Sequence, residues 1–474
     1  MRRYKLFRGT PLIIATEIFC FFSAIYCFIK SFTVFDFPLW IIPALYSFLL
    51  FLCRHNIQTM KNNLGAAIIN VGMICRYSIL PIIMYSTGMM SRFGKSYSYM
   101  NQAVILMCYE MICVFITLEI TGFKYKKKEE NIVNKEKEFN SVHLKGGFII
   151  AFAVIAILLG IGIKAKDLSS GFRVLTSGVI GSNNIEVNSS LANIIWQVLC
   201  VWLYMHGIMV EKEKYDLDHN KLHTTVVVIY TLAFVLVTFI ESIGFSRWYT
   251  VISAAASLGC LIHLFPKEKK KFSLLFGIPA SLMLLLITAY KNAGYVIGGG
   301  SSFLESIKDI FNATNFDSYF AGVVNVNNSI GLKQTGSLSI TAIFPDLINN
   351  MPIFNHYIDH SMTTVYQYNG YIGRLFGGTG DQIIPLVGQS IIYFGYIFGP
   401  LLTILSIIAF RWADYRFKTC YSYRQYVYAF LAAWFSVEAM MLNMTINVTW
   451  MYTRVIPFLI VLSMTDSISN KRRL

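Results

Sequence analysis

Residues 100–121 read MNQAVILMCYEMICVFITLEIT, and the next cluster of charge is KYKKK at 124–128. The apolar run is long enough to cross the ~30 Å hydrocarbon core of a bilayer as one helix, which takes roughly 20 residues. Basic residues directly after such a run favour a cytoplasmic end, because Lys and Arg are retained on that side during insertion. This stretch therefore predicts a transmembrane helix that ends in the cytoplasm.

The composition of the whole chain indicates the same class of protein. Of its 474 residues, 55% are hydrophobic and only 14% are charged, whereas a soluble domain carries about 25% charged residues. The net charge of +15 lies in short clusters between apolar runs. That distribution sets the orientation of a membrane protein, so we expect a lipid bilayer as a partner and no nucleic acid.

Similar apolar runs recur along the chain, and they predict an all-α polytopic integral membrane protein with about twelve transmembrane helices. The expected spans lie near residues 11–30, 37–53, 64–90, 100–121, 146–164, 189–210, 224–243, 248–265, 272–290, 385–410, 426–446 and 447–464. Only a polar tight turn within MLNMTINVTWMY (441–452) separates the last two. Alternation of the sides places the N- and C-termini in the cytoplasm, with most of the basic residues.

One expected connection, residues 291–384, is far longer than the others. It has apolar and aromatic residues throughout, and ordered loops of this length are usually functional. Ser302 followed by Glu305 predicts the start of a helix over 301–311, and 345–360 predicts a second helical stretch. The chain is thus expected to divide into helices one to nine with short loops, a large helical extracytoplasmic loop, and helices ten to twelve with a cytoplasmic C-terminus: 1–290, 291–384 and 385–474.

Several charged residues fall within or beside the expected spans, where charge is costly and is usually paired or set against a wet cavity. Arg76 and Glu110 lie at comparable depth in neighbouring helices and predict a buried ion pair. Glu241 and Arg247 flank a tight outer turn and predict another. Arg454 lies about seven residues inside the last span, roughly 10 Å deep at the helical rise. Its role is open between a structural one and one that faces an anion.

The end of the large loop carries residues suited to group transfer from a phosphate. HYIDH at 356–360 contains two histidines and an aspartate, and YNGYIGRLFGGTGDQ at 368–382 contains an arginine among glycines. Arginine forms paired, charge-assisted bonds to phosphate oxygens, and histidine can take a proton from a hydroxyl near neutral pH. The alternative is a flexible surface loop. The chain lacks a nucleotide-binding phosphate loop and a Cys/His metal motif, so we expect no cofactor and no metal.

The segment GGTGDQIIPLVGQSIIYFGYIFGPLLTILS at 377–406 resembles the Wzy-type polysaccharide polymerases, which include O-antigen, capsule and exopolysaccharide repeat-unit polymerases. The shared features are a glycine-rich loop end, a proline that opens a helix and the sequence YFGYIFG. The overall plan is also similar, with many spans, a large external loop before the final helices and a basic cytoplasmic face. The arginine–glycine spacings described in some members do not occur after Arg173 or Arg374.

The resemblance implies a GT-C-like glycosyltransferase in the bacterial cytoplasmic (inner) membrane. It would polymerise undecaprenyl-diphosphate-linked oligosaccharide repeat units into a surface polysaccharide of the cell envelope, on the outer face and without a metal. A chain-length regulator and a flippase would be its partners. Two alternatives stay open. A lipid-linked glycan ligase shares the topology and the chemistry, whereas a polysaccharide flippase or other transporter would usually have short loops.

In that reaction, cations hold the diphosphate and an acid/base residue activates the acceptor hydroxyl. The candidate diphosphate ligands are arginines, Arg374 and Arg454 first, then Arg247 and Arg173. The candidate base is a histidine of HYIDH, His360 or His356, and the candidate residue that orients it is Asp359.

Overall fold

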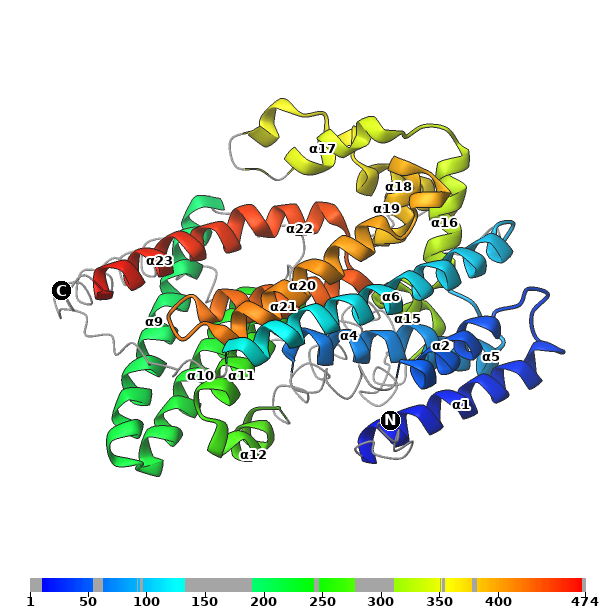
Figure 1. The fold of residues 1–474 in the computed structure, drawn as a ribbon. Helices are drawn as coiled ribbons and strands as arrows, with labels where there is room; N and C mark the ends of the chain where they lie inside the picture. Colours follow the sequence, from blue (N-terminus) through cyan, green and yellow to red (C-terminus); the bar gives the residue numbers. More distant parts are fainter. Residues whose placement is uncertain are drawn as a thin grey trace, which may run out of the picture. The chain divides into compact units, whose positions relative to one another are not determined.

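The computed structural model is helical wherever it describes regular structure (Figure 1). The described residues are 11–53, 63–91, 93, 97–132, 190–242, 247–277, 311–349, 351, 354–376 and 382–470. No strand occurs in these ranges. The expectation of an all-α chain is confirmed for this part of the protein.

Seven of the described helical stretches are long and apolar enough to cross a membrane: Ile13–Ser31, Leu64–Thr87, Met100–Tyr125, Ile194–Asp218, Lys221–Thr238, Tyr396–Thr419 and Met444–Thr465. A bent pair, Tyr249–Leu264 with Pro266–Phe276, meets at 114° and gives an eighth if it is one span. The chain is therefore a multi-pass helical protein with seven or eight candidate spans in its described part. Of the expected spans, 146–164 and most of 272–290 lie outside the described residues.

The chain forms two compact units, each built from segments distant in sequence. Unit 1 comprises Met1–Glu130, Phe311–Trp412 and Trp434–Thr449, and unit 2 comprises Asn131–Ile310, Ala413–Ala433 and Trp450–Leu474. The long helices of unit 2 are α9 (Ser190–Asp218), α10 (Lys221–Ser242), α11 (Arg247–Leu264) and α23 (Ile456–Asn470). The expected sidedness and the division at 290 and 384 stay predictions.

A buried ion pair joins the long helices of unit 1. α4 (Leu64–Ile74) and α5 (Leu80–Thr87) form one span, interrupted by the π-helical segment η1 (Cys75–Ile79) that carries Arg76. Arg76 Nη2 lies 2.8 Å from Glu110 Oε2 on α6 (Met100–Ile132), and both side chains are 1% exposed. Thr403 Oγ1 on α20 (Leu401–Thr419) donates to Glu110 Oε1 at 2.7 Å. The predicted Arg76–Glu110 pair is confirmed.

Two of the expected spans differ from the structure. The run at 37–53 forms only a short helix, α2 (Ile41–Leu52), packed on α1 (Pro11–Ser31). The run at 385–410 is not one helix, because Gly395 has φ = +81° and ends α19 (Leu386–Phe394); a 3₁₀ turn, η8 (Tyr396–Phe398), then leads into α20. Glycine takes this backbone conformation without the steric cost of a Cβ. The candidate span accordingly begins at Tyr396.

The break between the last two expected spans also lies earlier than the turn after residue 446. The break falls at residues 442 and 443, between the end of α21 (Gln425–Met441) and the start of α22 (Met444–Trp450). Asn443 accepts a hydrogen bond from Ile446 N at 2.9 Å through its side-chain oxygen. An asparagine in this position caps the first turn of a helix, which explains why the new helix starts there. The π-helical segment η9 (Met451–Val455) continues into α23.

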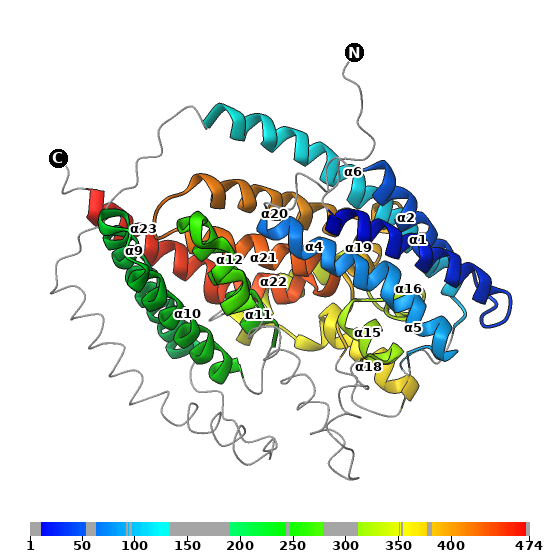
Figure 2. The same ribbon diagram turned by 90° about the horizontal axis from the view of Figure 1, so that it is seen from below.

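The described part of the large loop is a series of short helices, as expected (Figure 2). In chain order these are α15 (Ala313–Tyr319), α16 (Val323–Gln334), η5 (Ile340–Ala342), α17 (Ile343–Ile348), η6 (Phe354–Tyr357), η7 (His360–Met362) and α18 (Thr364–Phe376). α16 packs against α15, α18 and α19, and it is buried from Val323 to Leu332. The helix expected over 301–311, with Ser302 and Glu305, lies almost wholly outside the described residues.

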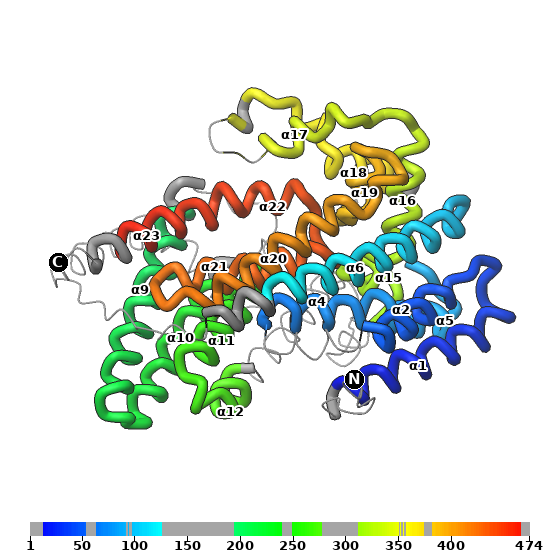
Figure 3. Tube along the Cα trace, in the orientation of Figure 1, coloured from blue at the N-terminus to red at the C-terminus, as the bar shows by residue number. Residues whose placement is uncertain are grey.

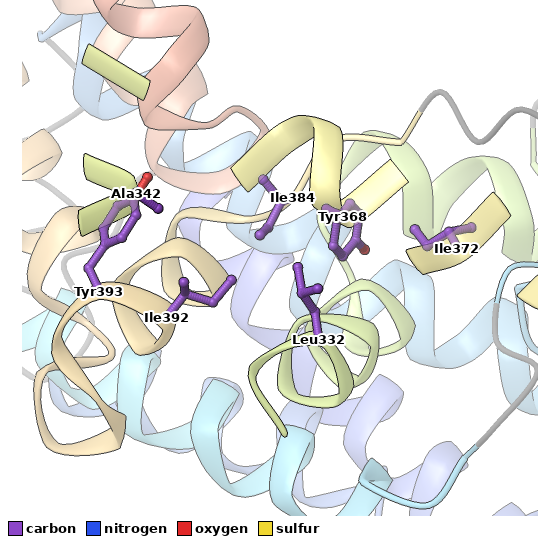
Figure 4. Close-up of a cluster of buried hydrophobic side chains, with 7 residues drawn as sticks. All are labelled: Leu332, Ala342, Tyr368, Ile372, Ile384, Ile392 and Tyr393. Atoms are coloured by element: carbon purple, nitrogen blue, oxygen red, sulfur yellow. The ribbon is translucent and has the colours of Figure 1, made fainter. Parts of the chain in front are cut away.

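A hydrophobic cluster holds these short helices to α19 (Figure 4). Its buried members come from α16, η5, α18 and the segment that leads into and forms α19: Leu332, Ala342, Tyr368, Ile372, Ile384, Ile392 and Tyr393. Burial of these side chains removes apolar area from water and stabilises the association. The described residues between 311 and 376 are therefore part of unit 1.

We expect Glu110→Gln and Arg76→Met each to destabilise the protein strongly, since each leaves a buried charge without its partner. The cost of breaking a buried ion pair in this way is about 3–5 kcal/mol. Thermal unfolding of the purified protein in detergent measures it. The double variant should lose less free energy of unfolding than the two single variants lose together, because it leaves no unpaired buried charge. Single variants as stable as the wild type would contradict the pairing.

Candidate functional site

Arg454 of unit 2 is held between two aromatic rings. Its guanidinium carbon lies 4.2 Å from the ring centroid of Tyr249 and 4.7 Å from that of Trp450. A guanidinium at such distances is attracted by the negative face of each ring. The stacking occupies the faces of the planar group, whereas phosphate oxygens bind its N–H edge, so the two kinds of contact are compatible.

This contact brings Arg454 to the beginning of α11. Tyr249 lies in the first turn of that helix, two residues after Arg247, at which the helix begins. Two of the four arginines expected to bind diphosphate therefore approach the same helix end although they are far apart in sequence. The first N–H groups of a helix and its dipole favour an anion at this end. The side chain of Arg247, and with it the predicted pair with Glu241, lies outside the described residues.

Both arginines that were expected inside spans occupy π-helical segments. Arg76 lies in η1 and Arg454 in η9. Short π-helical insertions are rare and occur frequently at functional sites. Arg76 is committed to Glu110, whereas the contacts of Arg454 include the two aromatic rings and Thr453 Oγ1, to which its Nη1 donates at 3.4 Å. The sequence did not indicate these local widenings of the helix.

His360 and Asp359, two candidates for the acid/base group, lie on the exposed surface of unit 1. The His360 Nδ1 atom is hydrogen-bonded to Asn349 Oδ1. Asp359 caps η7, because its side chain accepts a hydrogen bond from Ser361 N at 2.9 Å. Hydrogen bonds from the side chain and then the backbone of Ser361 lower the pKa of Asp359. The described partner that orients His360 is therefore Asn349, which the sequence did not indicate. The side chain of His356, in η6, is outside the described residues.

α18 separates His360 from Arg374. The helix begins at Thr364, just after η7, and Arg374 lies near its other end. Ten residues of α-helix correspond to about 15 Å. The backbone positions of these two candidates are therefore separated by most of the length of α18. The Arg374 side chain, Asp381 and all of the segment that contains Arg173 lie outside the described residues.

The structure also shows a buried polar network around Asp346, a residue that is not among the candidates from the sequence. The carboxylate is 1% exposed. It accepts hydrogen bonds from Thr364 Oγ1 at 2.7 Å, Thr364 N at 3.0 Å, Thr445 Oγ1 at 3.1 Å and the Tyr393 hydroxyl. Gln389 Nε2 donates to Thr364 Oγ1 at 2.8 Å. One carboxylate therefore ties together α17, α18, α19 and α22.

Burial raises the pKa of Asp346, and the four donors oppose the rise. A second buried carboxyl, Asp317, accepts hydrogen bonds from Val324 N at 3.0 Å through Oδ1 and from Asn325 Nδ2 at 2.8 Å through its backbone carbonyl. Burial raises the pKa of Asp317 to about 7, against hydrogen bonds from the backbone of Val324 and Asn325 and the charge of Arg76. Asp317 can thus change its protonation state near neutral pH.

Comparison of the chain with known protein families, with curated proteins and with solved structures finds no match.

Asp346→Asn should destabilise unit 1. Both carboxylate oxygens of Asp346 accept hydrogen bonds, whereas the amide nitrogen of asparagine can only donate. Hydrogen bonds to a charged group contribute about 1.5–3 kcal/mol each, so the loss should be of that order. Thermal unfolding in detergent measures it. The matched control is Asp359→Asn, an exposed cap position where asparagine caps as well as aspartate, and it should change little. Equal midpoints for the two variants would contradict a structural role of Asp346.

Asp317 should make stability depend on pH. Its pKa is raised from 3.8 to about 7 in the folded state, so between these values the folded protein holds a proton that the unfolded chain has lost. Stability should therefore fall as the pH rises from roughly 4 to roughly 7 and be level above that. Asp317→Asn should flatten the curve in this window. An unchanged slope of unfolding midpoint against pH in the variant would show that other groups cause it.

Proposed function

We propose that this protein is a glycosyltransferase that polymerises undecaprenyl-diphosphate-linked oligosaccharide repeat units into a surface polysaccharide. The single observation that supports it best is the approach of Arg454, stacked on Tyr249 and Trp450, to the helix end that carries Arg247. Cations set next to a helix N-terminus suit a diphosphate. The resemblance of residues 377–406 to Wzy-type polymerases is the reason to specify the lipid-linked donor.

The proposed reaction needs no nucleotide. The bond between the anomeric carbon of the growing chain and a diphosphate oxygen breaks, and the electron pair leaves with the lipid diphosphate. A hydroxyl at the non-reducing end of a fresh repeat unit forms the new bond to that carbon and gives its proton to a base, for which His360 is the described candidate. Arg454 would act on the departing charge, because preorganised cations that stabilise developing charge are usually the largest catalytic term.

The finer architecture belongs to the same proposal. It comprises about twelve spans of GT-C-like arrangement in a bacterial cytoplasmic membrane, both termini in the cytoplasm, and residues 291–384 on the outer face. The helical packing of 311–376 onto α19 favours an enzyme over a transporter, since transporters usually place their polar residues at the midplane and keep their loops short. A chain-length regulator and a flippase would be the partners.

The glycans of a deletion strain test the proposal against its alternatives. Loss of a polymerase leaves single repeat units on the lipid carrier or at the surface, which is the expected result. Full-length polymer retained on the carrier would identify a ligase. Absence of any repeat unit outside the membrane would identify a flippase. Either of these two outcomes would overturn the proposed reaction.

Arg454→Ala should abolish detectable polymer, since removal of one preorganised donor costs about 10²–10³ in rate. Arg454→Lys should recover little, because an ammonium lacks the planar fork that binds two phosphate oxygens and stacks on rings. Tyr249→Phe is the matched control: it keeps the ring beneath the guanidinium and should give normal polymer. Polymer length on gels is measured at equal membrane levels of each variant.

Arg374→Ala and His360→Ala test the candidates in unit 1 in the same way. Both should remove polymer without lowering the amount of protein in the membrane. Normal polymer in the Arg454→Ala protein would contradict the arginine site, and normal polymer in the His360→Ala protein would exclude that histidine as the base.

A further inference from the structure

The short helices η5 and α17 have their polarity reversed compared with a helix on a water-covered surface. The one charged side chain of this segment, Asp346, points inward to its network and is 1% exposed, and the one other polar side chain, Thr341, is exposed. The apolar side chains point outward: Ile340 is 57%, Phe344 65% and Leu347 37% exposed. A helix that faces water shows the opposite arrangement, with its apolar stripe toward the core.

The same character extends through the next residues. Phe354, Tyr357 and Met362 are all exposed, as are the polar Asp359 and His360 among them. We call the exposed apolar side chains of this stretch the outer apolar face: Ile340, Phe344, Leu347, Phe354, Tyr357 and Met362. No Lys or Arg occurs between Lys333 and Arg374, so nothing basic in this stretch would attract a polyanion. Large exposed apolar patches mark surfaces that contact a protein, a ligand or a membrane.

The outer apolar face continues a surface that already belongs to a candidate span. Ala342 of η5 is buried in the cluster with Ile392 and Tyr393 of α19. α19 leads directly into η8, where the candidate span Tyr396–Thr419 begins. Gln334 Nε2 donates to the Tyr396 hydroxyl at 3.2 Å, which fixes the start of this span to the end of α16.

Exposed apolar residues follow along that span. Ile397 is 78% exposed at its beginning, and Leu405 and Ile408 are exposed further on. On a membrane-spanning helix such side chains face lipid. The outer apolar face thus lies next to the end of a lipid-facing surface within the same unit, and Figure 3 shows α17 (yellow) at the edge of this unit.

We propose that the outer apolar face lies in the interfacial layer of the bilayer, with the side chains of α17 among the lipid head groups and upper acyl chains. Elements that lie in this layer have an apolar face buried about 5–10 Å into the boundary, and Tyr is enriched there because its ring is apolar and its hydroxyl is wet. The buried Asp346 network fits this placement, because it satisfies the one charged group of η5 and α17 on the protein side. The exposed Thr341, Asp359 and His360 would lie among the polar head groups. The proposal does not depend on the reaction that the protein catalyses.

Lipid-borne quenchers test it. The full-length Phe344→Cys protein is labelled with bimane, reconstituted into vesicles of phosphatidylethanolamine and phosphatidylglycerol, and compared with Ser337→Cys, a matched exposed position on the polar turn between α16 and η5. Wild-type protein treated identically corrects for the native cysteines. Lipids that carry a nitroxide high on the acyl chain should quench the label at position 344 several times more strongly than the label at position 337. A nitroxide near the chain end should quench the label at position 344 less than the high one.

Three results would overturn the proposal. Absence of quenching of the label at position 344 by either lipid nitroxide would place the face in water. Stronger quenching by the deep nitroxide would place α17 in the hydrocarbon core rather than at the interface. Efficient disulfide crosslinking between two copies of the unlabelled Phe344→Cys protein, without lipid quenching of the labelled one, would assign the face to a contact between copies of this chain. Labelled variants are compared at equal monodispersity in detergent, so that misfolding does not imitate any of these results.

Discussion

The cost of placing charge in an apolar environment is the constraint on which the rest of this structure depends. Arg76 and Glu110 satisfy it by a direct ion pair with Thr403 as a further donor, and this contact joins three long helices of unit 1. Asp346 satisfies it with hydroxyl and backbone donors from α18, α19 and α22. Isolated buried charge is strongly unfavourable, so each of these groups determines which helices must meet around it.

Arg454 meets the same constraint differently. Its guanidinium lies against two aromatic faces in a π-helical segment and at the first turn of α11. The ring contacts stabilise the cation through its flat faces. An anion binds a guanidinium through its N–H edge, so the ring contacts are compatible with anion binding. Arg76 is neutralised by a carboxylate and so has a structural role. The proposed ligand role of Arg454 rests on its ring contacts and on its place at the first turn of α11.

The sequence predicted the features that depend on local composition. The apolar runs predicted most of the described spans, and the matched depths of Arg76 and Glu110 predicted their pair. It did not predict the break at Gly395, because a single glycine in an apolar run is compatible with a continuous helix until its φ is known. The aromatic contacts of Arg454 and the donors around Asp346 come from distant segments, so no local pattern contains them. His360 was identified from the chemistry of its type, but its partner Asn349 lies eleven residues away in the sequence, so no local pattern pairs them.

If a lipid diphosphate is the leaving group, the glycan donor is already activated. The purified chain should then transfer the glycan without a nucleotide or another protein. Purified protein in vesicles, supplied with an undecaprenyl-diphosphate-linked repeat unit, EDTA and no nucleotide, tests this central claim most directly. We predict a ladder of lipid-linked polymer and release of undecaprenyl diphosphate in equal molar amount to the linkages formed. Intact repeat units that cross the membrane without any new glycosidic bond would contradict the claim.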